Sequence, residues 1–270
     1  MLYTIIIIIL FFIFSGFIYY NNRWIITDKN VYNNDFIIIS HRGNHQKYYE
    51  NTIPAFYSAL EYNIDGIELD IQMTFDNRLI VFHDFHLKKL GQPNILIQKT
   101  KWEEINNHQL GKNKLETIPL FEQVLSSIGG KTILNIEIKS YNLLDLSISE
   151  NVIEIIKKNN LLNQCIISSF NPLILKKIKK KYPEVLIAWI WSKNNSYRVL
   201  RTIHWLNFVK PDFFHGDINS LNKNIINKIK KHNLKIIAYT VNSKEQYNKS
   251  KEMGLDGIIT DYLDKYVIKK

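Results

Sequence analysis

Cysteine is almost absent from this sequence, and glycine and proline are scarce. The only cysteine, Cys165, has no partner for an internal disulfide, and no cluster of cysteine and histidine exists that would hold zinc. After residue 35, no stretch rich in proline, glycine or serine divides the chain, and no internal repeat is visible. Apolar residues are plentiful, at 46% of the 270 residues, which is enough to bury a sizeable core. We therefore expect one folded domain over residues 36–265.

The charge balance is basic, with a formal net charge of +10. Lysine, asparagine and isoleucine are abundant along the whole chain, which indicates a general trend in residue usage. The lysine-rich run at residues 176–181 has no interleaved aromatic residues and no glycine-rich RNA-binding pattern. Solvated helix faces explain such a run, so no nucleic-acid partner is expected. The alternative, a nucleic-acid-binding protein, would show steeply salt-dependent binding.

Residues 2–20 form an uncharged, apolar run of 19 residues. As a helix this run would measure about 28 Å, close to the roughly 30 Å hydrocarbon core of a bilayer. Tyr19, Tyr20 and Trp24 stand where interfacial aromatic residues are expected. We predict a single-pass N-terminal transmembrane anchor with its flank over residues 1–24, a linker over residues 25–35, and a membrane location.

Two other interpretations of the apolar run stay open. A cleaved signal peptide has basic residues before its apolar run and a small-residue cleavage site after it, whereas here only Met1 precedes the run and Tyr19-Tyr20-Asn21-Asn22 ends it. A buried core helix would carry a polar face, which this run lacks. The side of the membrane that carries the domain is left open, because Arg23 and Lys29 are offset by nearby aspartates.

Short apolar runs alternate with longer amphipathic ones over the rest of the chain. This alternation predicts a parallel sheet with helices outside, and its length suits a (β/α)8 TIM barrel, preceded by the one transmembrane helix. Nine runs are predicted as strands, one more than the barrel needs, so either the run at 212–215 or the last one is expected to be short or misassigned. The predicted strands are 36–40, 66–71, 79–82, 133–138, 165–170, 185–191, 212–215, 235–241 and 257–260. The predicted helices include 52–62, 119–127, 148–158, 172–180 and 223–231.

Polar and ionisable residues stand at the ends of four of these predicted strands. In a parallel barrel, all strand ends of one polarity meet at one rim, where active sites are built. Glu68 and Asp70 are two positions apart, so they point to the same side of their strand. The residues at the four ends are His41 and Arg42, then Glu68 and Asp70, then His83 with Asp84, then Glu137 and Lys139.

Three carboxylates from two strands, Glu68, Asp70 and Glu137, would repel one another unless a cation or a proton intervened. They form a hard-oxygen site suited to one divalent cation, Ca²⁺ or Mg²⁺. His41 and His83 are candidates for general base and general acid, because imidazole titrates near neutral pH.

Arg42 and Lys139 are candidates for holding the phosphate of an anionic substrate. The alternative interpretation of the same pattern is a set of structural salt bridges from the carboxylates to Arg42 and Lys139. The remaining histidines are interpreted as structural, and His45 is among them.

The motifs resemble those of the glycerophosphodiester phosphodiesterases, in family order from about residue 36 to 262. Asp65–Asp70 resembles the DGIELD strand of that family, and Val81–Asp84 its HD strand end. The opening resembles the family's HRG…ENT…AF pattern, at His41-Arg42-Gly43, Glu50-Asn51-Thr52 and Ala55-Phe56. Further matches are the IPxxE turn at 118–122, Asn135–Lys139, Ser168–Phe170, Thr240–Asn242 and Asp256–Asp261.

The resemblance implies metal-dependent hydrolysis of glycerophosphodiesters to glycerol 3-phosphate and an alcohol. It implies a divalent cation on Glu68, Asp70 and Glu137, with His41 and His83 as the acid–base pair. The substrate would be a small-molecule phosphodiester or a lysolipid. Lysophospholipase D-type activity at the same site and a non-catalytic barrel that binds lipid headgroups remain alternatives. The preferred headgroup, the metal and the oligomeric state are left open.

Three local features support the same site. Gly43 is expected to permit a tight turn beside it. Asn51 or Thr52 is expected to cap the helix that begins near Pro54. Phe170 and Tyr239 are candidates for lining the substrate pocket, although aromatic residues at strand ends often serve packing alone.

Overall fold

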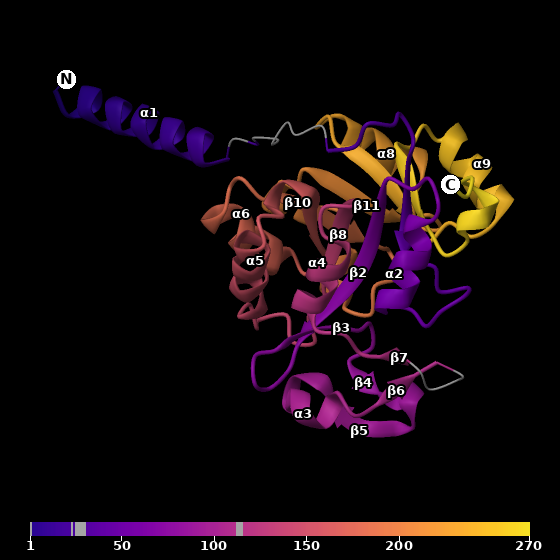
Figure 1. Ribbon diagram of the computed structural model, residues 1–270. Helices are drawn as coiled ribbons and strands as arrows, with labels where there is room; N and C mark the ends of the chain where they lie inside the picture. The colour runs from indigo at the N-terminus through magenta and orange to yellow at the C-terminus, as the bar shows by residue number, and fades with distance from the viewer. Residues whose placement is uncertain (1, 23, 25–30, 112–115) are drawn as a thin grey trace.

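Eight parallel strands form a closed ring in the computed structural model, which describes residues 2–22, 24, 31–111 and 116–270. The ring closes because the first strand pairs with both the last strand and the second one. The predicted TIM barrel is therefore confirmed (Figure 1). In ring order the strands are β1 (Ile37–His41), β2 (Gly66–Met73), β8 (Ile133–Ile138), β9 (Cys165–Ser169), β10 (Leu186–Trp191), β11 (Phe213–Asp217), β12 (Lys235–Tyr239) and β13 (Gly257–Thr260).

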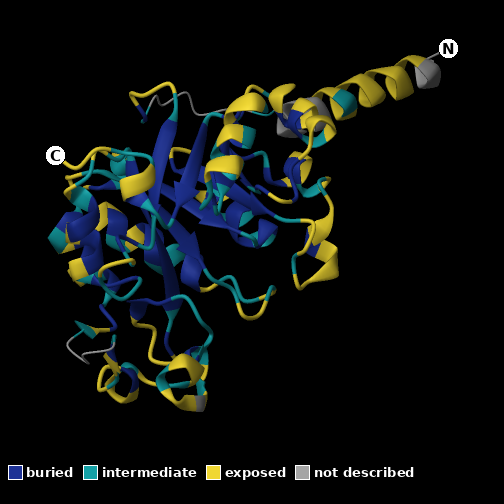
Figure 2. Cartoon of the chain, turned by 90° about the vertical axis from the view of Figure 1, so that its right-hand side faces the viewer, coloured by how far each residue is buried: buried dark blue, intermediate teal, exposed yellow. Residues whose placement is uncertain are grey.

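Amphipathic helices cover the outside of the ring. In α5 (Ile148–Lys158), for example, Ile148, Val152 and Ile156 fall on one face at helical spacing and are buried against the strands. The buried residues shown in Figure 2 lie in the strands and on the helix faces that meet them. The other covering helices are α2 (Ile53–Leu60), α4 (Phe121–Ile128), α6 (Pro172–Lys181), α7 (Trp205–Val209), α8 (Lys223–Lys230) and α9 (Lys244–Glu252).

The one predicted strand that does not belong to the ring is β3 (Leu79–Val81). It pairs antiparallel with the end of β2, so it is a hairpin extension of that strand. The expectation that the run at 212–215 or the last run was the superfluous one is wrong. Both belong to the barrel, as β11 and β13, because each pairs in parallel with two neighbours.

A small subdomain follows β3 and lies below the barrel in Figure 1. It has its own apolar cluster, which includes Phe82, Leu87, Ile97 and Ile105. The sequence does not reveal this subdomain, because three of its four described strands have two residues and α3 has four, which is too short for a readable period. Its elements are β4 (His86–Leu87), β5 (Gln92–Leu96), α3 (Trp102–Ile105), β6 (Gln109–Leu110) and β7 (Glu116–Thr117).

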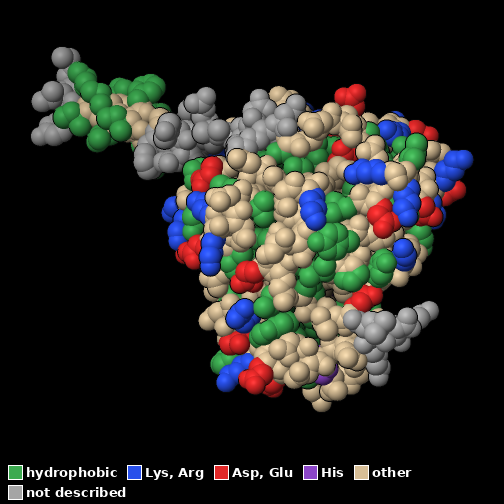
Figure 3. Space-filling model, in the orientation of Figure 1, with side chains coloured by type: hydrophobic (Ala, Val, Ile, Leu, Met, Phe, Trp, Pro, Cys, Tyr) green, Lys and Arg blue, Asp and Glu red, His purple; other side chains and the backbone are tan. Residues whose placement is uncertain are grey.

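The N-terminal helix α1 (Leu2–Asn22) extends away from the barrel in Figures 1 and 2. Its side chains from Ile5 to Phe14 are exposed, and apolar atoms cover this stretch in Figure 3. Across the described residues, no helix combines the length and the apolar character needed to cross a bilayer. The predicted transmembrane anchor is therefore not supported, and the membrane location stays a prediction.

The predicted linker is only partly visible, because residues 25–30 lie outside the described residues. In its described part, Tyr32 is buried in the interior of the barrel together with Ile37, Ile39 and Phe213. The Tyr32 ring meets Phe213 edge-on, with 5.9 Å between the ring centroids. Since Ile37 and Phe213 begin their strands, Tyr32 closes the end of the barrel opposite the strand ends that carry the polar residues.

Truncating Tyr32 to alanine is expected to lower the free energy of unfolding by about 3 kcal/mol, because it opens a cavity under the barrel. The hydroxyl of Tyr32 is buried and has no hydrogen-bond partner among the described residues. Tyr32→Phe should therefore leave the stability unchanged or slightly raised. Urea denaturation of both variants checks the pair, and equal destabilisation by both would contradict this role for the ring.

Candidate active site

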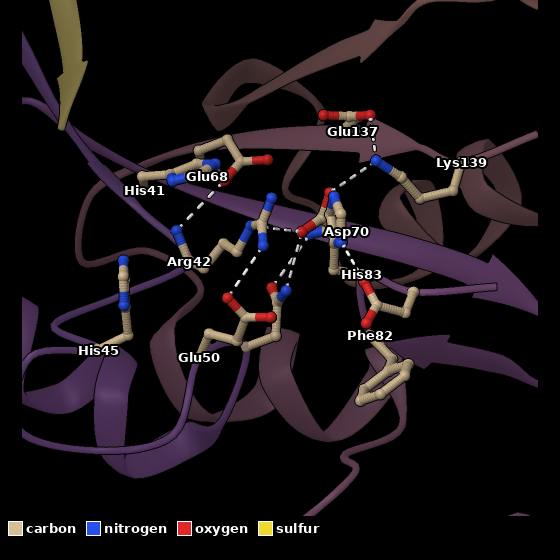
Figure 4. Close-up of polar contacts among 12 residues, drawn as sticks. His41, Arg42, His45, Glu50, Glu68, Asp70, Phe82, His83, Glu137 and Lys139 are labelled. Atoms are coloured by element: carbon tan, nitrogen blue, oxygen red, sulfur yellow. Dashed lines mark hydrogen bonds and ion pairs between the residues drawn. The ribbon is translucent and has the colours of Figure 1, made fainter. Parts of the chain in front are cut away.

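The register of three strands brings the predicted site residues together. His41 pairs with Glu68 across β1 and β2, and Asp70 pairs with Glu137 across β2 and β8. Neighbouring strands lie only about 4.8 Å apart, so these side chains share one edge of the barrel. His83 joins them from the segment after β3, as Figure 4 shows.

The backbone after β1 turns sharply to place Arg42 over this edge. Arg42 and Gly43 both have positive φ angles, of 58° and 79°. A Cβ atom at Gly43 would lie 2.7 Å from the carbonyl carbon of Ala55, so this position requires glycine. The tight turn expected at Gly43 is confirmed, and the helix cap is Thr52, whose side chain accepts from the Ala55 amide.

The three carboxylates form a buried cluster. Glu68, Asp70 and Glu137 each offer an oxygen, and these atoms lie within 4.8 Å of one another. Glu68 Oε1 is buried and accepts no hydrogen bond from any residue that the structure describes. Burial, together with the charges of Asp70 and Glu137, raises the pKa of Glu68 well above its ordinary value. A buried oxygen without a partner among like charges fits a cation ligand, so the donor set suits a hard divalent ion.

Two basic side chains hold Asp70 in its ionised form. Lys139 Nζ lies 3.5 Å from its Oδ1 and Arg42 Nε lies 3.0 Å from its Oδ2. Burial opposes ionisation, but Lys139 and Arg42 outweigh it, so the pKa of Asp70 is lowered. Asn51 adds a hydrogen bond from Nδ2 to Asp70 Oδ2 at 2.8 Å and accepts from the Asp70 amide at 3.1 Å.

The two cations are themselves fixed by acidic partners. Arg42 donates from NH1 to Glu50 Oε2 at 2.9 Å, and Lys139 donates to Glu137 Oε1 at 2.9 Å. Burial disfavours the charge of Lys139, but Glu137 and Asp70 overcome this and raise its pKa to about 12. Lys139 is therefore protonated at neutral pH and adds positive charge beside the carboxylate cluster.

His41 is oriented by a carboxylate at the end of β13. Its Nδ1 lies 2.6 Å from Asp261 Oδ1, and its Nε2 lies 3.9 Å from Glu68 Oε2. Asn242 donates to the other Asp261 oxygen at 2.6 Å. The Asp261 contact fixes Nδ1 as the protonated nitrogen and leaves Nε2 facing the carboxylate cluster.

His83 is held in the same manner. Its Nδ1 lies 2.6 Å from Asp84 Oδ1, and Lys89 lies 3.0 Å from the other Asp84 oxygen. Burial, assisted by the positive charges of Lys139 and Arg42, lowers the pKa of His83 despite the opposing effect of Asp70. Asp84 thus orients His83.

The structure brings the seven predicted site residues to one rim and adds others that the sequence analysis did not assign. Glu50, Asn51 and Asp261 all stood within quoted motifs, which was the available indication. His45 was interpreted as structural, yet its Nε2 lies 2.8 Å from the same Asp261 oxygen that His41 contacts. No sequence pattern pointed to His45 as a second partner of this carboxylate.

A cavity of about 370 Å³ opens beside the site. Glu137 and Lys139 form one part of its wall, and Phe170 and Tyr239 form another. Of the two interpretations of Phe170 and Tyr239, plain packing and the lining of a substrate pocket, the second stays a prediction, although both residues do line the cavity.

A closed α/β barrel with carboxylates and imidazoles gathered at the carboxyl ends of its strands has the architecture of a TIM-barrel enzyme, in which active sites are built at this rim. The profile of the glycerophosphoryl diester phosphodiesterase family matches residues 41–265. The chain belongs to this family, as its motifs predicted, and it is an enzyme of that class.

Individual relatives agree over most of their length. A glycerophosphodiester phosphodiesterase of Caldanaerobacter subterraneus subsp. tengcongensis is 34% identical, over 83% of this chain and 93% of the relative. One from Bacillus altitudinis is 30% identical, over 85% of this chain and 96% of its own. A phosphodiesterase structure from Oleispira antarctica, in complex with the product sn-glycerol-3-phosphate, has 26% identity and a TM-score of 0.74, covering 85% of this chain and 94% of its own.

Proposed function

We propose that this protein hydrolyses glycerophosphodiesters to glycerol 3-phosphate and an alcohol at the rim described above, with one divalent cation. The observation that carries the proposal is the meeting of three buried carboxylates, two basic side chains and two oriented imidazoles at one place. The product complex of the Oleispira antarctica relative supports this choice of products. Neither alternative, a lysophospholipase D-type activity or a non-catalytic barrel, is favoured by the relatives.

Glu68, Asp70 and Glu137 would hold the cation, Ca²⁺ or Mg²⁺. When bound, it would offset the negative charge on the phosphate oxygens. Arg42 and Lys139 would bind the same phosphate, since both keep N–H groups beyond those used by Glu50 and Glu137. Because both cations are anchored by acidic partners, they are positioned before the substrate arrives.

His41 and His83 would perform the proton transfers. In the first step, His41 Nε2 takes the proton of the glycerol 2-hydroxyl as its oxygen bonds to phosphorus. The bond from phosphorus to the alcohol breaks, and His83, which enters this step as the imidazolium, gives the proton on its Nε2 to the leaving oxygen. A cyclic phosphate results. Water then opens it with the roles reversed, so that His83 takes the proton of the water and His41 returns its proton to the 2-hydroxyl oxygen.

Removal of the metal tests the proposal directly. The full chain should release glycerol 3-phosphate from glycerophosphocholine when Ca²⁺ or Mg²⁺ is present. Chelation should lower the rate by about 10³-fold, because the phosphate then meets three carboxylates whose charge Arg42 and Lys139 offset only in part. Adding the ion back should restore activity, measured by an enzymatic assay for glycerol 3-phosphate. Turnover that survives complete metal removal would refute the metal's role.

A further inference from the structure

The cavity beside Glu137 and Lys139 is placed to receive one arm of a phosphodiester. Its volume of about 370 Å³ falls within the range of roughly 300–1,000 Å³ common for small-molecule sites. It lies at the carboxyl ends of β8 to β12, where Ser169, Ser192, Asp217 and Tyr239 line it. A phosphate held by Lys139 would therefore direct either the glycerol or the alcohol arm into this space.

The charge of the cavity away from the catalytic rim is negative. Glu137 and Lys139 are paired at 2.9 Å, so their charges offset one another. Among the described residues that line the cavity, the one further Asp, Glu, Lys or Arg is Asp217, at the end of β11. No salt bridge found between described residues includes Asp217.

Neutral donors hold the Asp217 carboxylate in place. Its Oδ2 accepts from Ser192 Oγ at 2.9 Å and from Ser220 Oγ at 2.5 Å, and its Oδ1 accepts from the Asn219 amide at 3.0 Å. These donors are neutral hydroxyl and amide groups, so they hold the carboxylate in position without cancelling its charge. Asp217 is thus a fixed negative charge on the wall of a half-open cavity.

Aromatic rings stand next to this carboxylate. Tyr239 is the register partner of Asp217 on β12, and its hydroxyl donates to the Trp191 carbonyl at 3.1 Å. Phe170 meets Tyr239 edge-on, with 6.1 Å between the ring centroids. Phe85 and Tyr197 add aromatic surface to the lining. Aromatic faces with a nearby carboxylate attract a cation that cannot donate hydrogen bonds, such as a quaternary ammonium.

We propose that this cavity binds a cationic alcohol arm, and that Asp217 makes the enzyme prefer glycerophosphodiesters of choline-type ammonium alcohols. The inference rests on the proposed function. A neutral polyol arm gains nothing from the charge of Asp217, and an acidic arm is repelled by it. Phe170 and Tyr239 then contact the alkyl groups of the ammonium while Asp217 faces its charge.

The sharpest test compares two substrates of the same shape. Glycerophosphocholine and its carbon isostere, the 3,3-dimethylbutyl ester, differ only in the charge of the leaving arm and both release glycerol 3-phosphate. The wild-type enzyme should show a kcat/KM about tenfold higher for the choline ester. Asp217→Asn, which keeps an acceptor oxygen for the serines, should bring this ratio close to one. Asp35→Asn removes the same charge at an exposed position before β1, on the opposite end of the barrel, and should leave the ratio unchanged.

The outcomes separate this inference from the proposed function. Equal kcat/KM for the two esters in the wild type would overturn the cationic cavity while leaving the phosphodiesterase activity intact. No release of glycerol 3-phosphate from any diester would overturn the proposed function itself. If Asp217→Asn lowers both values equally, Asp217 has a structural role and its assignment to specificity is wrong. The wild-type comparison decides the matter even if that variant folds poorly.

Discussion

Replacing His41 by glutamine is expected to lower kcat for glycerophosphocholine by about 10³-fold. Glutamine can still donate to Asp261, but its amide cannot take a proton from the attacking hydroxyl. His41 Nε2 faces the carboxylate cluster, 3.9 Å from Glu68 Oε2, so the imidazole stands where the reacting phosphate would bind. KM should change far less than kcat, because the groups proposed to bind the phosphate are Arg42 and Lys139. Steady-state kinetics on the metal-loaded enzyme checks this prediction.

A matched histidine controls for general effects of the substitution. His204 is exposed, at the start of α7 on the outside of the barrel, and His204→Gln should keep wild-type kinetics. Thermal unfolding should show that His41→Gln remains folded. If His41→Gln retains more than about a tenth of the wild-type kcat, the general base must be another group. His83 would then be the first to examine, since it is held by Asp84 in the same geometry.

The barrel was predictable because its strands and helices follow local rules. The run at Ile133–Ile138 is apolar and β-branched, and it forms the strand with those bounds. The helix at Ile148–Lys158 also has its predicted bounds, since its apolar residues repeat at helical spacing. Alternation of the two kinds of run then leaves few topologies. The catalytic rim followed from this topology, because polar residues that end parallel strands meet at one edge.

The contacts that complete the site were not predictable in the same way. Asp261 is 220 residues from His41 in the sequence, and only closure of the barrel between β1 and β13 brings them together. Asn51 looked like a helix cap, yet its backbone has a φ of 60° and its side chain bonds Asp70 instead. β3 was predicted as a strand, but its antiparallel direction depends on a tertiary pairing with β2 that no local pattern encodes. The pairing of segments that are distant in the sequence therefore determines which polar side chain orients each histidine and carboxylate of the site.

Replacing Glu68 by glutamine is expected to stabilise the metal-free protein while reducing activity by about 10³-fold or more. Glu68 is buried beside Asp70 and Glu137, its Oε1 has no hydrogen-bond partner in the described part of the chain, and its pKa is raised chiefly by burial. Ionisation of this group therefore weakens the fold, and the neutral amide should increase the free energy of unfolding by about 1–2 kcal/mol. Glutamine keeps an oxygen that can accept from the Arg42 amide, as Glu68 Oε2 does at 3.2 Å.

The free energy of unfolding of the metal-free wild type should rise as the pH falls. The pKa of Glu68 is higher in the folded protein than in the unfolded chain, where a glutamate has a pKa of about 4.3. The folded state therefore binds the proton more tightly, and it gains stability as the pH falls from above the folded pKa toward the unfolded pKa. This contribution should be present in the wild type and absent from Glu68→Gln. Urea denaturation with chelator at several pH values measures it.

Adding the metal should reverse the order of stability. An ion that binds only the folded wild type at 100 times its dissociation constant adds about 2.7 kcal/mol, whereas Glu68→Gln lacks one of the three oxyanions and should gain far less. Glu252→Gln removes a carboxylate at an exposed position in α9 and should follow the wild type both with and without metal. If Glu68→Gln instead destabilises the metal-free protein, Glu68 is a structural partner of the neighbouring cations. The carboxylate cluster would then be a salt-bridge network. In a metal site, by contrast, the carboxylates repel one another until the ion binds, so removing one charge should stabilise the metal-free protein.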